Sequence, residues 1–132
     1  EYGAATGRPR RVGPFDAVAS AYGLKCQNAD KIALTKLDVL SHMDEIPVIT
    51  SYKLNDEIIT EFDPLDDLDS MTPVTQMLPG WNTDISKCRK YEELPENARK
   101  YIETLEHLLN HEIQFISVGA ERNQYLTKGE WL

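Results

Sequence analysis

The strongest periodic pattern in the chain lies between Pro95 and Leu109. Proline favours the first turn of a helix, and the asparagine at position 110 tolerates the left-handed backbone that ends one. The pattern therefore predicts a single helix over 95–109, whose apolar face must pack against another layer of the fold. The apolar positions of this face are Ala98, Tyr101, Ile102, Leu105, Leu108 and Leu109.

Short apolar runs on both sides of this helix predict strands. The predicted strands cover residues 31–35, 46–54, 57–62 and 113–116. Asn55 and Asp56 separate the second strand from the third, and such a pair favours a tight hairpin turn. Ser117 to Gly119 follow the last strand as a turn. Strands that alternate with helices indicate a mixed α/β fold.

An earlier helix is predicted after the first arginines, because Phe15, Val18, Ala19 and Tyr22 recur at helical spacing. Asp16 is expected in its first turn, where the helix dipole favours a carboxylate. Between residues 64 and 90, proline and glycine interrupt every regular period. We expect irregular structure in that stretch.

Charge is distributed unevenly along the chain, whose net charge is −8. Residues 1–36 hold six Lys and Arg against three Asp and Glu, whereas residues 37–72 hold one against ten. A nucleic-acid-binding protein needs a broad basic face with interleaved aromatic residues, so one short basic cluster argues against that class. The acidic side chains at 63–69 are expected in a solvated loop.

Membrane and secretory signals are not found in the sequence. No apolar run approaches the roughly 18 residues of a membrane span, and no signal-peptide pattern opens the chain. We expect a soluble cytoplasmic protein, with no membrane partner. Since the chain begins at Glu1 instead of methionine, we also expect the natural polypeptide to extend upstream.

Cysteines and histidines do not form a metal-ligand pattern. Cys26 and Cys88 lack the paired spacing of a zinc or redox site. His107 and His111 are four residues apart, but the second falls beyond the predicted end of its helix at Asn110. Structural or surface roles are expected for these residues and for His42, with no metal bound.

Two short segments point to ligand binding. Gly3 to Arg11 combines glycines, a threonine and three arginines, a set suited to a carboxylate or phosphate because guanidinium groups form paired hydrogen bonds with both. Thr35 to Asp38 follows a predicted strand. There a carboxylate in the plane of a purine accepts two hydrogen bonds from guanine but not from adenine. Taken alone, the second segment is more typical of a solvated strand end.

Five segments, in their order along the chain, closely resemble the carboxyl-terminal part of the adenylosuccinate synthetase family. They are Gly3–Arg11, Leu34–Leu40, Leu78–Trp81, Leu94–Ala98 and Ile116–Gly119. The resemblance covers residues 2 to about 124. It implies that residues 1–132 are a mixed-sheet fragment of a larger P-loop-like GTP-binding ligase fold.

The resemblance implies a GTP-dependent ligase that joins L-aspartate to inosine monophosphate (IMP) in purine biosynthesis. It places L-aspartate and IMP on Ala4, Ala5, Thr6, Gly7, Arg8, Pro9 and Arg10. It places GTP on Arg10, Lys36, Leu37, Asp38, Ser117, Val118 and Gly119. The family commonly has a second threonine where this chain has Ala5, which puts the affinity for L-aspartate in question.

The family's catalytic aspartate and histidine, its phosphate-binding glycine loop and its Mg²⁺ ligands are expected upstream of residue 1. The fragment alone is therefore expected to be inactive, and the full-length protein is expected to be a homodimer. Two alternatives remain open. A GTP-dependent switch protein would use Thr35 to Asp38 in a similar way, and a noncatalytic guanine-nucleotide-binding domain would keep the fold without the chemistry.

Overall fold

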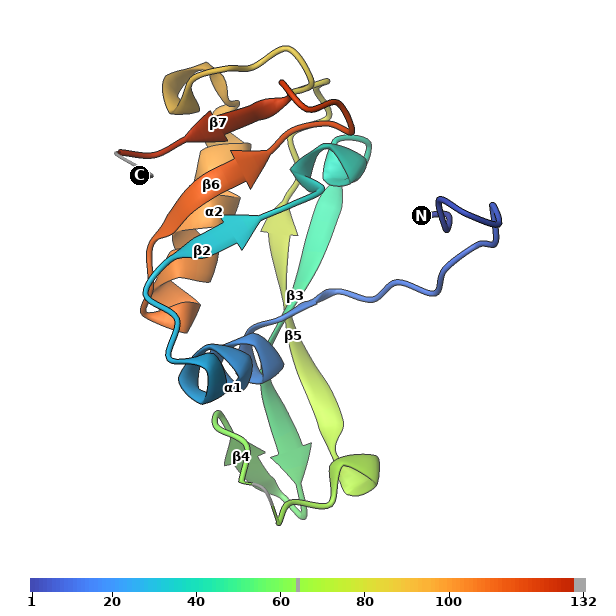
Figure 1. Ribbon diagram of the computed structural model, residues 1–132. Coiled ribbons are helices and arrows are strands. Elements are labelled where there is room, and N and C mark those ends of the chain that lie inside the picture. Colours follow the sequence, from blue (N-terminus) through green and yellow to red (C-terminus); the bar gives the residue numbers. More distant parts are fainter. Residues whose placement is uncertain (64, 130–132) are drawn as a thin grey trace.

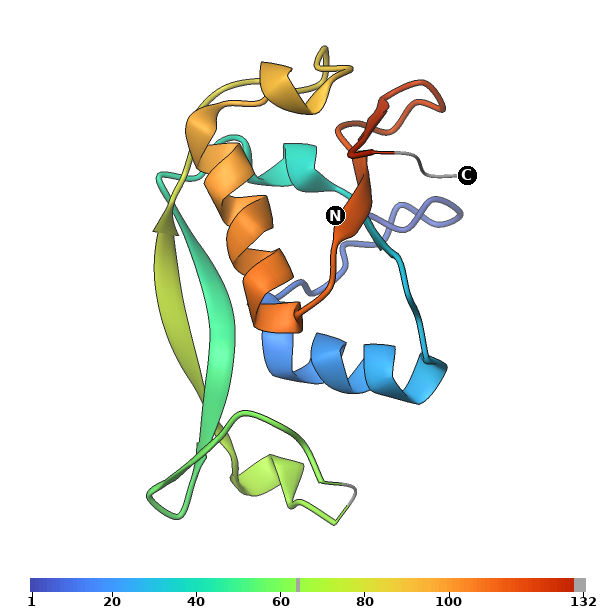
Figure 2. The same cartoon turned by 90° about the vertical axis from the view of Figure 1, so that its left-hand side faces the viewer.

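A computed structural model of the chain describes residues 1–63 and 65–129. Pro64, the first residue of the stretch predicted to be irregular, lies outside the described residues, as do residues 130–132. Within the described part, the strands form two sheets with helix α2 (Glu96–Leu109) between them. Figure 1 shows the smaller sheet in front of α2, and Figure 2 shows the longer strands on the opposite side of the helix.

The smaller sheet contains β2 (Ile32–Leu34), β6 (Ile113–Ser117) and β7 (Tyr125–Thr127). β2 runs parallel to β6, with Leu34 opposite Ile116, and β7 runs antiparallel to β6. The predicted strands at 31–35 and 113–116 are thereby confirmed, whereas no strand is predicted at β7. Parallel pairing brings the carboxyl ends of β2 and β6 to the same edge of the sheet.

The larger sheet is arranged around β3 (Glu45–Leu54). β3 pairs in parallel with β1 (Phe15–Asp16) and antiparallel with β4 (Glu57–Ile59) and β5 (Thr72–Pro79). The predicted hairpin is confirmed: Asn55 and Asp56 have φ values of 48° and 71° between β3 and β4. These left-handed values suit a two-residue turn between twisted strands.

The prediction of irregular structure over residues 64–90 is wrong for β5. This strand pairs with β3 from Glu45 opposite Pro79 to Lys53 opposite Thr72. Pro73 and Pro79 are tolerated because β5 lies at the edge of its sheet, where a missing N–H need not interrupt a ladder. Its side chains are mostly exposed, so β5 lacks the apolar pattern that would have identified it. A single turn of 3-10 helix, η2 (Leu68–Ser70), occupies another part of the stretch, and a second, η3 (Tyr91–Glu93), follows it.

The predicted apolar face of the first helix is wrong. Helix α1 spans Ala17–Gln27, so Phe15 precedes it, and both Ala19 and Tyr22 are exposed. Its buried residues are Ala17 and Val18. α1 contacts both β3 and α2, and these contacts bury the start of the helix and not a full apolar stripe.

Asp16 caps α1 instead of lying in its first turn. One carboxylate oxygen accepts a hydrogen bond from the Ala19 N–H at 2.9 Å, and the other accepts one from the Tyr52 hydroxyl. Burial, and secondarily this hydrogen bond, raises the pKa of Tyr52 to about 12. Asp16 thus ends β1, starts α1 and ties the helix to β3.

The predicted helix over 95–109 is confirmed as α2, which ends at Asn110 in the left-handed conformation. Its buried side chains join those of both sheets in one core, so α2 holds the two sheets together. The largest fully buried side chains of the core include Leu37, Ile46, Ile85, Ile102, Leu105, Ile113, Ile116 and Leu126.

Gly80, just after β5, lies at a close backbone contact. A Cβ at this position would lie 1.8 Å from the Met43 carbonyl oxygen. The Gly80 carbonyl accepts a hydrogen bond from Asn97 Nδ2 at 2.8 Å, and the neighbouring Trp81 indole donates to Ser41 Oγ at 3.0 Å. Two of the segments that carry the family resemblance, Leu78–Trp81 and Leu94–Ala98, are therefore linked directly, and the first also contacts the residues just after Leu34–Leu40.

We expect Gly80→Ala to destabilise the protein, because its Cβ cannot fit without moving the backbone near Met43. The expected loss is roughly 1–3 kcal/mol or more. Gly23→Ala is the control, since a Cβ in α1 meets nothing within 4 Å. Replacing a helical glycine should stabilise the fold by roughly 0.5–1 kcal/mol. Thermal unfolding of the full-length variants tests both, and equal melting temperatures would contradict the prediction.

Candidate functional site

The segment Gly3–Arg11, here called the arginine loop, forms a small hairpin that extends away from both sheets (Figure 1). The Gly3 N–H donates to the Arg8 carbonyl at 2.9 Å, and the Gly7 N–H donates to the Gly3 carbonyl at 2.8 Å. Gly7 has a φ of +64°, which closes the turn in a conformation that favours glycine. The predicted loop is thus organised by its own backbone.

The arginine loop is open to solvent, since every residue from Ala4 to Arg11 is exposed. Thr6 Oγ1 accepts a hydrogen bond from the Arg8 N–H at 3.4 Å, so the hydroxyl lies next to the first arginine. Exposed guanidinium groups beside a hydroxyl can bind an incoming carboxylate without first losing buried partners. The loop is therefore chemically suited to an anion.

Lys36 to Asp38, here called the Lys-Leu-Asp segment, connects β2 to the 3-10 helix η1 (Leu37–Leu40). Lys36 has a φ of 62°, which turns the chain sharply after the strand. Leu37 is buried in the core, while Lys36 is exposed and Asp38 is half-buried. The buried leucine between two polar residues anchors the segment and leaves both polar side chains accessible.

Ser117 to Gly119, here called the serine turn, follows β6. Ser117 Oγ donates to the Gly119 carbonyl at 3.0 Å, and the N–H of the buried Val118 donates to the Gln124 carbonyl at 2.9 Å. A Cβ on Gly119 would lie 2.2 Å from Gln124 Oε1. This oxygen also accepts a hydrogen bond from the Glu121 N–H at 2.9 Å. Gln124 therefore braces the turn.

The fold brings the Lys-Leu-Asp segment and the serine turn together. Leu34 and Ile116 are paired in parallel strands, and each of the two segments leaves its strand at the same edge. η1 also contacts β6, and Figure 1 shows it beside the end of that strand. The two segments predicted to bind GTP are consequently neighbours in space although about 80 residues separate them in sequence.

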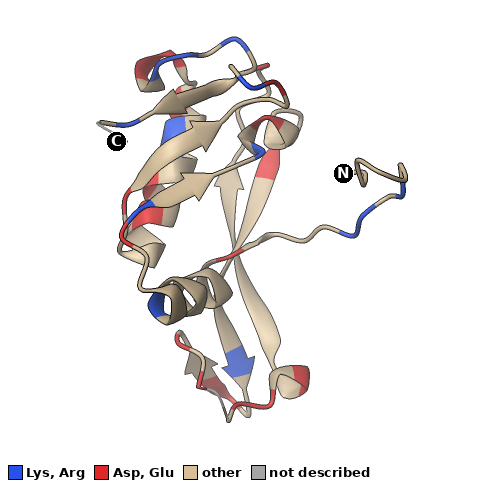
Figure 3. Ribbon diagram, viewed as in Figure 1, with Lys and Arg blue, Asp and Glu red and all other residues tan. Residues whose placement is uncertain are grey.

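The arginine loop reaches the Lys-Leu-Asp segment through Glu1. Glu1 Oε1 lies 2.8 Å from Lys36 Nζ and 3.4 Å from Arg10 Nη1. The hydrogen bond from Lys36 lowers the pKa of the Glu1 carboxyl below its usual value. Figure 3 shows the basic residues of the loop, with acidic residues gathered around η2 at the far end of β3 and β5.

Comparison with known proteins agrees with this geometry. Residues 1–126 match the family model described as adenylosuccinate synthetase. The chain belongs to the adenylosuccinate synthetase family. The chain is also similar to the adenylosuccinate synthetase of Clostridioides difficile strain 630, with 44% identity over 129 residues that cover 97% of this chain and 30% of the relative. The Desulforamulus reducens protein of the same name is 46% identical over 125 residues, 94% of this chain and 29% of the relative.

A solved structure has the same fold as this member of the adenylosuccinate synthetase family. The structure described as fully ligated adenylosuccinate synthetase from Plasmodium falciparum has a TM-score of 0.88 and 40% sequence identity. The match covers 97% of this chain and 31% of that structure's chain. The chain therefore spans about 30% of the length of these relatives, which confirms that it is a fragment of the family's fold.

Metal ligands are not found among the described residues, where no group of three or more His, Cys, Asp or Glu could hold an ion. Both cysteines are free, Cys26 exposed and Cys88 half-buried. In the same part of the chain, no helix is long and apolar enough to cross a membrane. The chemistry of the described site is thus that of arginine, lysine, carboxylate and hydroxyl groups.

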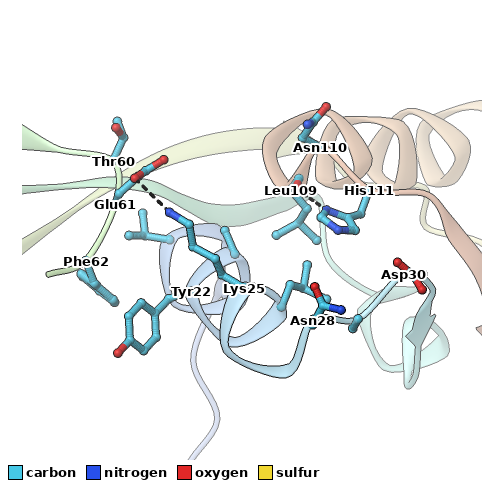
Figure 4. Close-up of a pocket in the computed structure, with 14 residues that line it drawn as sticks. Tyr22, Lys25, Asn28, Asp30, Thr60, Glu61, Phe62, Leu109, Asn110 and His111 are labelled. Atoms are coloured by element: carbon cyan, nitrogen blue, oxygen red, sulfur yellow. Dashed lines mark hydrogen bonds and ion pairs between the residues drawn. The ribbon is translucent and has the colours of Figure 1, made fainter. Parts of the chain in front are cut away.

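A separate cleft of about 420 Å³ lies between the ends of α1 and α2 (Figure 4). None of the predicted site residues lines it. Lys25 and Glu61 form an ion pair of 3.4 Å at this cleft, and His111 Nδ1 lies 2.9 Å from the Leu109 carbonyl oxygen.

Glu1 and Gln124 are the two residues of the site that the sequence did not reveal. Neither belongs to a recognisable motif, and each acts through a contact with a residue distant in the chain or in another segment. Gln124 accepts hydrogen bonds from the N–H groups of Glu121 and Val118. It directly precedes β7, which pairs with β6.

We expect Gln124→Ala to loosen the serine turn, because the Glu121 N–H loses its side-chain acceptor. Hydrogen exchange of the amides at 118–121 should accelerate by roughly fivefold, the effect of losing one ordinary hydrogen bond. Gln76→Ala, on the exposed strand β5, is the matched control and should leave these amides unchanged. Identical exchange in the wild type and Gln124→Ala would contradict the bracing role.

Proposed function

We propose that this chain is the carboxyl-terminal ligand-binding part of a GTP-dependent ligase that joins L-aspartate to IMP and forms adenylosuccinate. The observation that carries the proposal is the arrangement of three segments, the arginine loop, the Lys-Leu-Asp segment and the serine turn, on one side of the fold. The family match over residues 1–126 supports the same activity.

Guanine is read by Asp38 in this proposal. Its carboxylate accepts hydrogen bonds from N1–H and the exocyclic amine of guanine, whereas adenine has no N1–H and would leave an acceptor unpaired. The aliphatic stem of Lys36 lies along the base, and Ser117 to Gly119 close its other side. The buried Leu37 supports this role, since it anchors the backbone that carries the two flanking residues.

L-aspartate is bound by the arginine loop in this proposal. The two carboxylates of the substrate require more than one cationic group, and Arg8 and Arg10 offer two planar forks. Thr6 supplies a hydroxyl, Arg8 also contacts the ribose of IMP, and Arg10 extends toward GTP. The exposure of the loop supports a segment that closes over its ligand when the ligand arrives.

The chemical steps require residues outside this chain. GTP phosphorylates the 6-oxygen of IMP, and the amine of L-aspartate then displaces the phosphate. We assign the catalytic aspartate and histidine, the phosphate-binding loop and the Mg²⁺ ligands to the part of the family's length that this chain does not cover, so the fragment alone is inactive. We further propose that the full-length protein is a cytoplasmic homodimer.

Asp38→Asn is expected to change the nucleotide preference of the full-length enzyme from GTP toward xanthosine triphosphate. The asparagine amide donates where the carboxylate accepted, and xanthine presents a carbonyl where guanine has its amine. The KM for GTP should rise by about 10- to 100-fold, the effect of losing hydrogen bonds to a charged group. Adenylosuccinate formation with each nucleotide measures the change.

Asp69→Asn is the control for charge, since Asp69 lies in the exposed turn η2 far from the site. It should keep the preference for GTP. If the wild type binds guanine nucleotide but makes no adenylosuccinate, the ligase assignment fails. If Asp38→Asn keeps the wild-type KM for GTP, the guanine-reading role fails.

Ala5→Thr is expected to strengthen the binding of L-aspartate, because it restores a hydroxyl that is common at this position in the family. The KM for L-aspartate should fall by about two- to tenfold, as one added hydrogen bond would produce. Ala5→Val has nearly the same shape without the hydroxyl and serves as the matched control. Equal KM values for the Thr and Val variants would show that Ala5 does not face the substrate.

A further inference from the structure

Glu1 connects the two ligand-binding segments through one carboxylate. Its Oε1 atom contacts Lys36 Nζ at 2.8 Å and Arg10 Nη1 at 3.4 Å. The Glu1 side chain is 24% exposed, whereas those of Lys36 and Arg10 are 54% and 62% exposed. The carboxylate is therefore the sheltered centre of a three-residue cluster whose cationic members remain accessible.

The backbone reinforces this connection on the side of the arginine loop. The Arg10 N–H donates to the Glu1 carbonyl at 2.9 Å, and Tyr2 pairs with Pro9 in the next position of the hairpin. Glu1 and Arg10 are therefore joined both by their backbones and by their side chains.

The connection also fixes the geometry of Lys36. The residue has a left-handed φ of 62°, which residues other than glycine adopt rarely, and the next residue, Leu37, is buried in the core. The main chain of Lys36 is held by Leu37, and its ammonium group is held by Glu1. Lys36 is thus held both at its main chain and at its ammonium group.

We infer that Glu1 is a positioning residue that couples the binding of L-aspartate in the arginine loop to the binding of guanine nucleotide at the Lys-Leu-Asp segment. This inference rests on the proposed function. When a carboxylate of L-aspartate takes over Arg10, the Glu1 carboxylate becomes free to hold Lys36 alone, in the orientation that the base requires. Since coupling between two sites is reciprocal, guanine nucleotide must strengthen the binding of L-aspartate by the same factor.

The test measures the Kd of GDP for the full-length protein, by titration calorimetry with IMP present, with and without saturating L-aspartate. GDP avoids turnover. In the wild type, L-aspartate should lower the Kd of GDP by about fivefold, the lower end of typical coupling between sites. The coupling ratio is the Kd of GDP without L-aspartate divided by the Kd with it. In Glu1→Gln this ratio should fall to about one, because an amide cannot hold either cation by charge.

Three further measurements separate coupling from a general structural effect. Glu96→Gln removes another carboxylate, which pairs with Lys100 at 2.6 Å on α2, and should keep the wild-type ratio. Glu1→Asp keeps the charge on a shorter side chain and should restore part of the coupling. Raising the salt concentration should lower the ratio in the wild type but not in Glu1→Gln, since salt screens exposed ion pairs.

The outcomes distinguish this inference from the proposed function. If Glu1→Gln keeps the wild-type ratio, or if the wild type shows no coupling, the positioning role of Glu1 is wrong while the ligase assignment stands. If the wild type does not bind GDP, the proposed function itself fails. If Glu1→Gln has a lowered melting temperature, the same comparison made with Glu1→Asp decides the question.

Discussion

The parallel pairing of β2 with β6 is the constraint on which the candidate site depends. It sets Leu34 opposite Ile116, and both strands then end at one edge of the smaller sheet. In the proposed site, this register lets the Lys-Leu-Asp segment and the serine turn face the same base. Helix α2 secures the pairing from behind, because its buried face joins Ile113 and Ile116 in the core. The side chains proposed to recognise the base are polar, but their geometry is set by buried apolar contacts.

The two halves of the candidate site differ in how firmly they are held. The Lys-Leu-Asp segment is anchored by the buried Leu37, and the end of β5 is clamped against neighbouring backbone at Gly80. The arginine loop, by contrast, is exposed and contacts the rest of the molecule through Glu1. Under the proposed function, this contrast matches a firmly held nucleotide site beside a substrate loop that closes over its ligand.

Hydrophobic periodicity and turn residues predicted those helices, strands and turns that are stabilised by interactions between residues close in the sequence. The stop at Asn110, the hairpin at Asn55 and Asp56, and the strand before Lys36 all follow from periodicity and turn chemistry. β5 could not be predicted in this way, because an exposed edge strand containing proline is stabilised by its partner β3 and not by its own pattern. The ligand-binding residues suggested by the five motifs stay a prediction, whereas the contact of Glu1 with Lys36 joins distant segments and could not be read from any motif.

Hydrogen exchange of the full-length protein with and without GDP tests the central claim most directly, since it reports on each segment separately. The account predicts that GDP slows exchange in residues 36–40 and 117–121 together, because one base occupies the space between two turns held at the same sheet edge. Protection of only one of these segments, or protection confined to the cleft between α1 and α2, would contradict a shared guanine site.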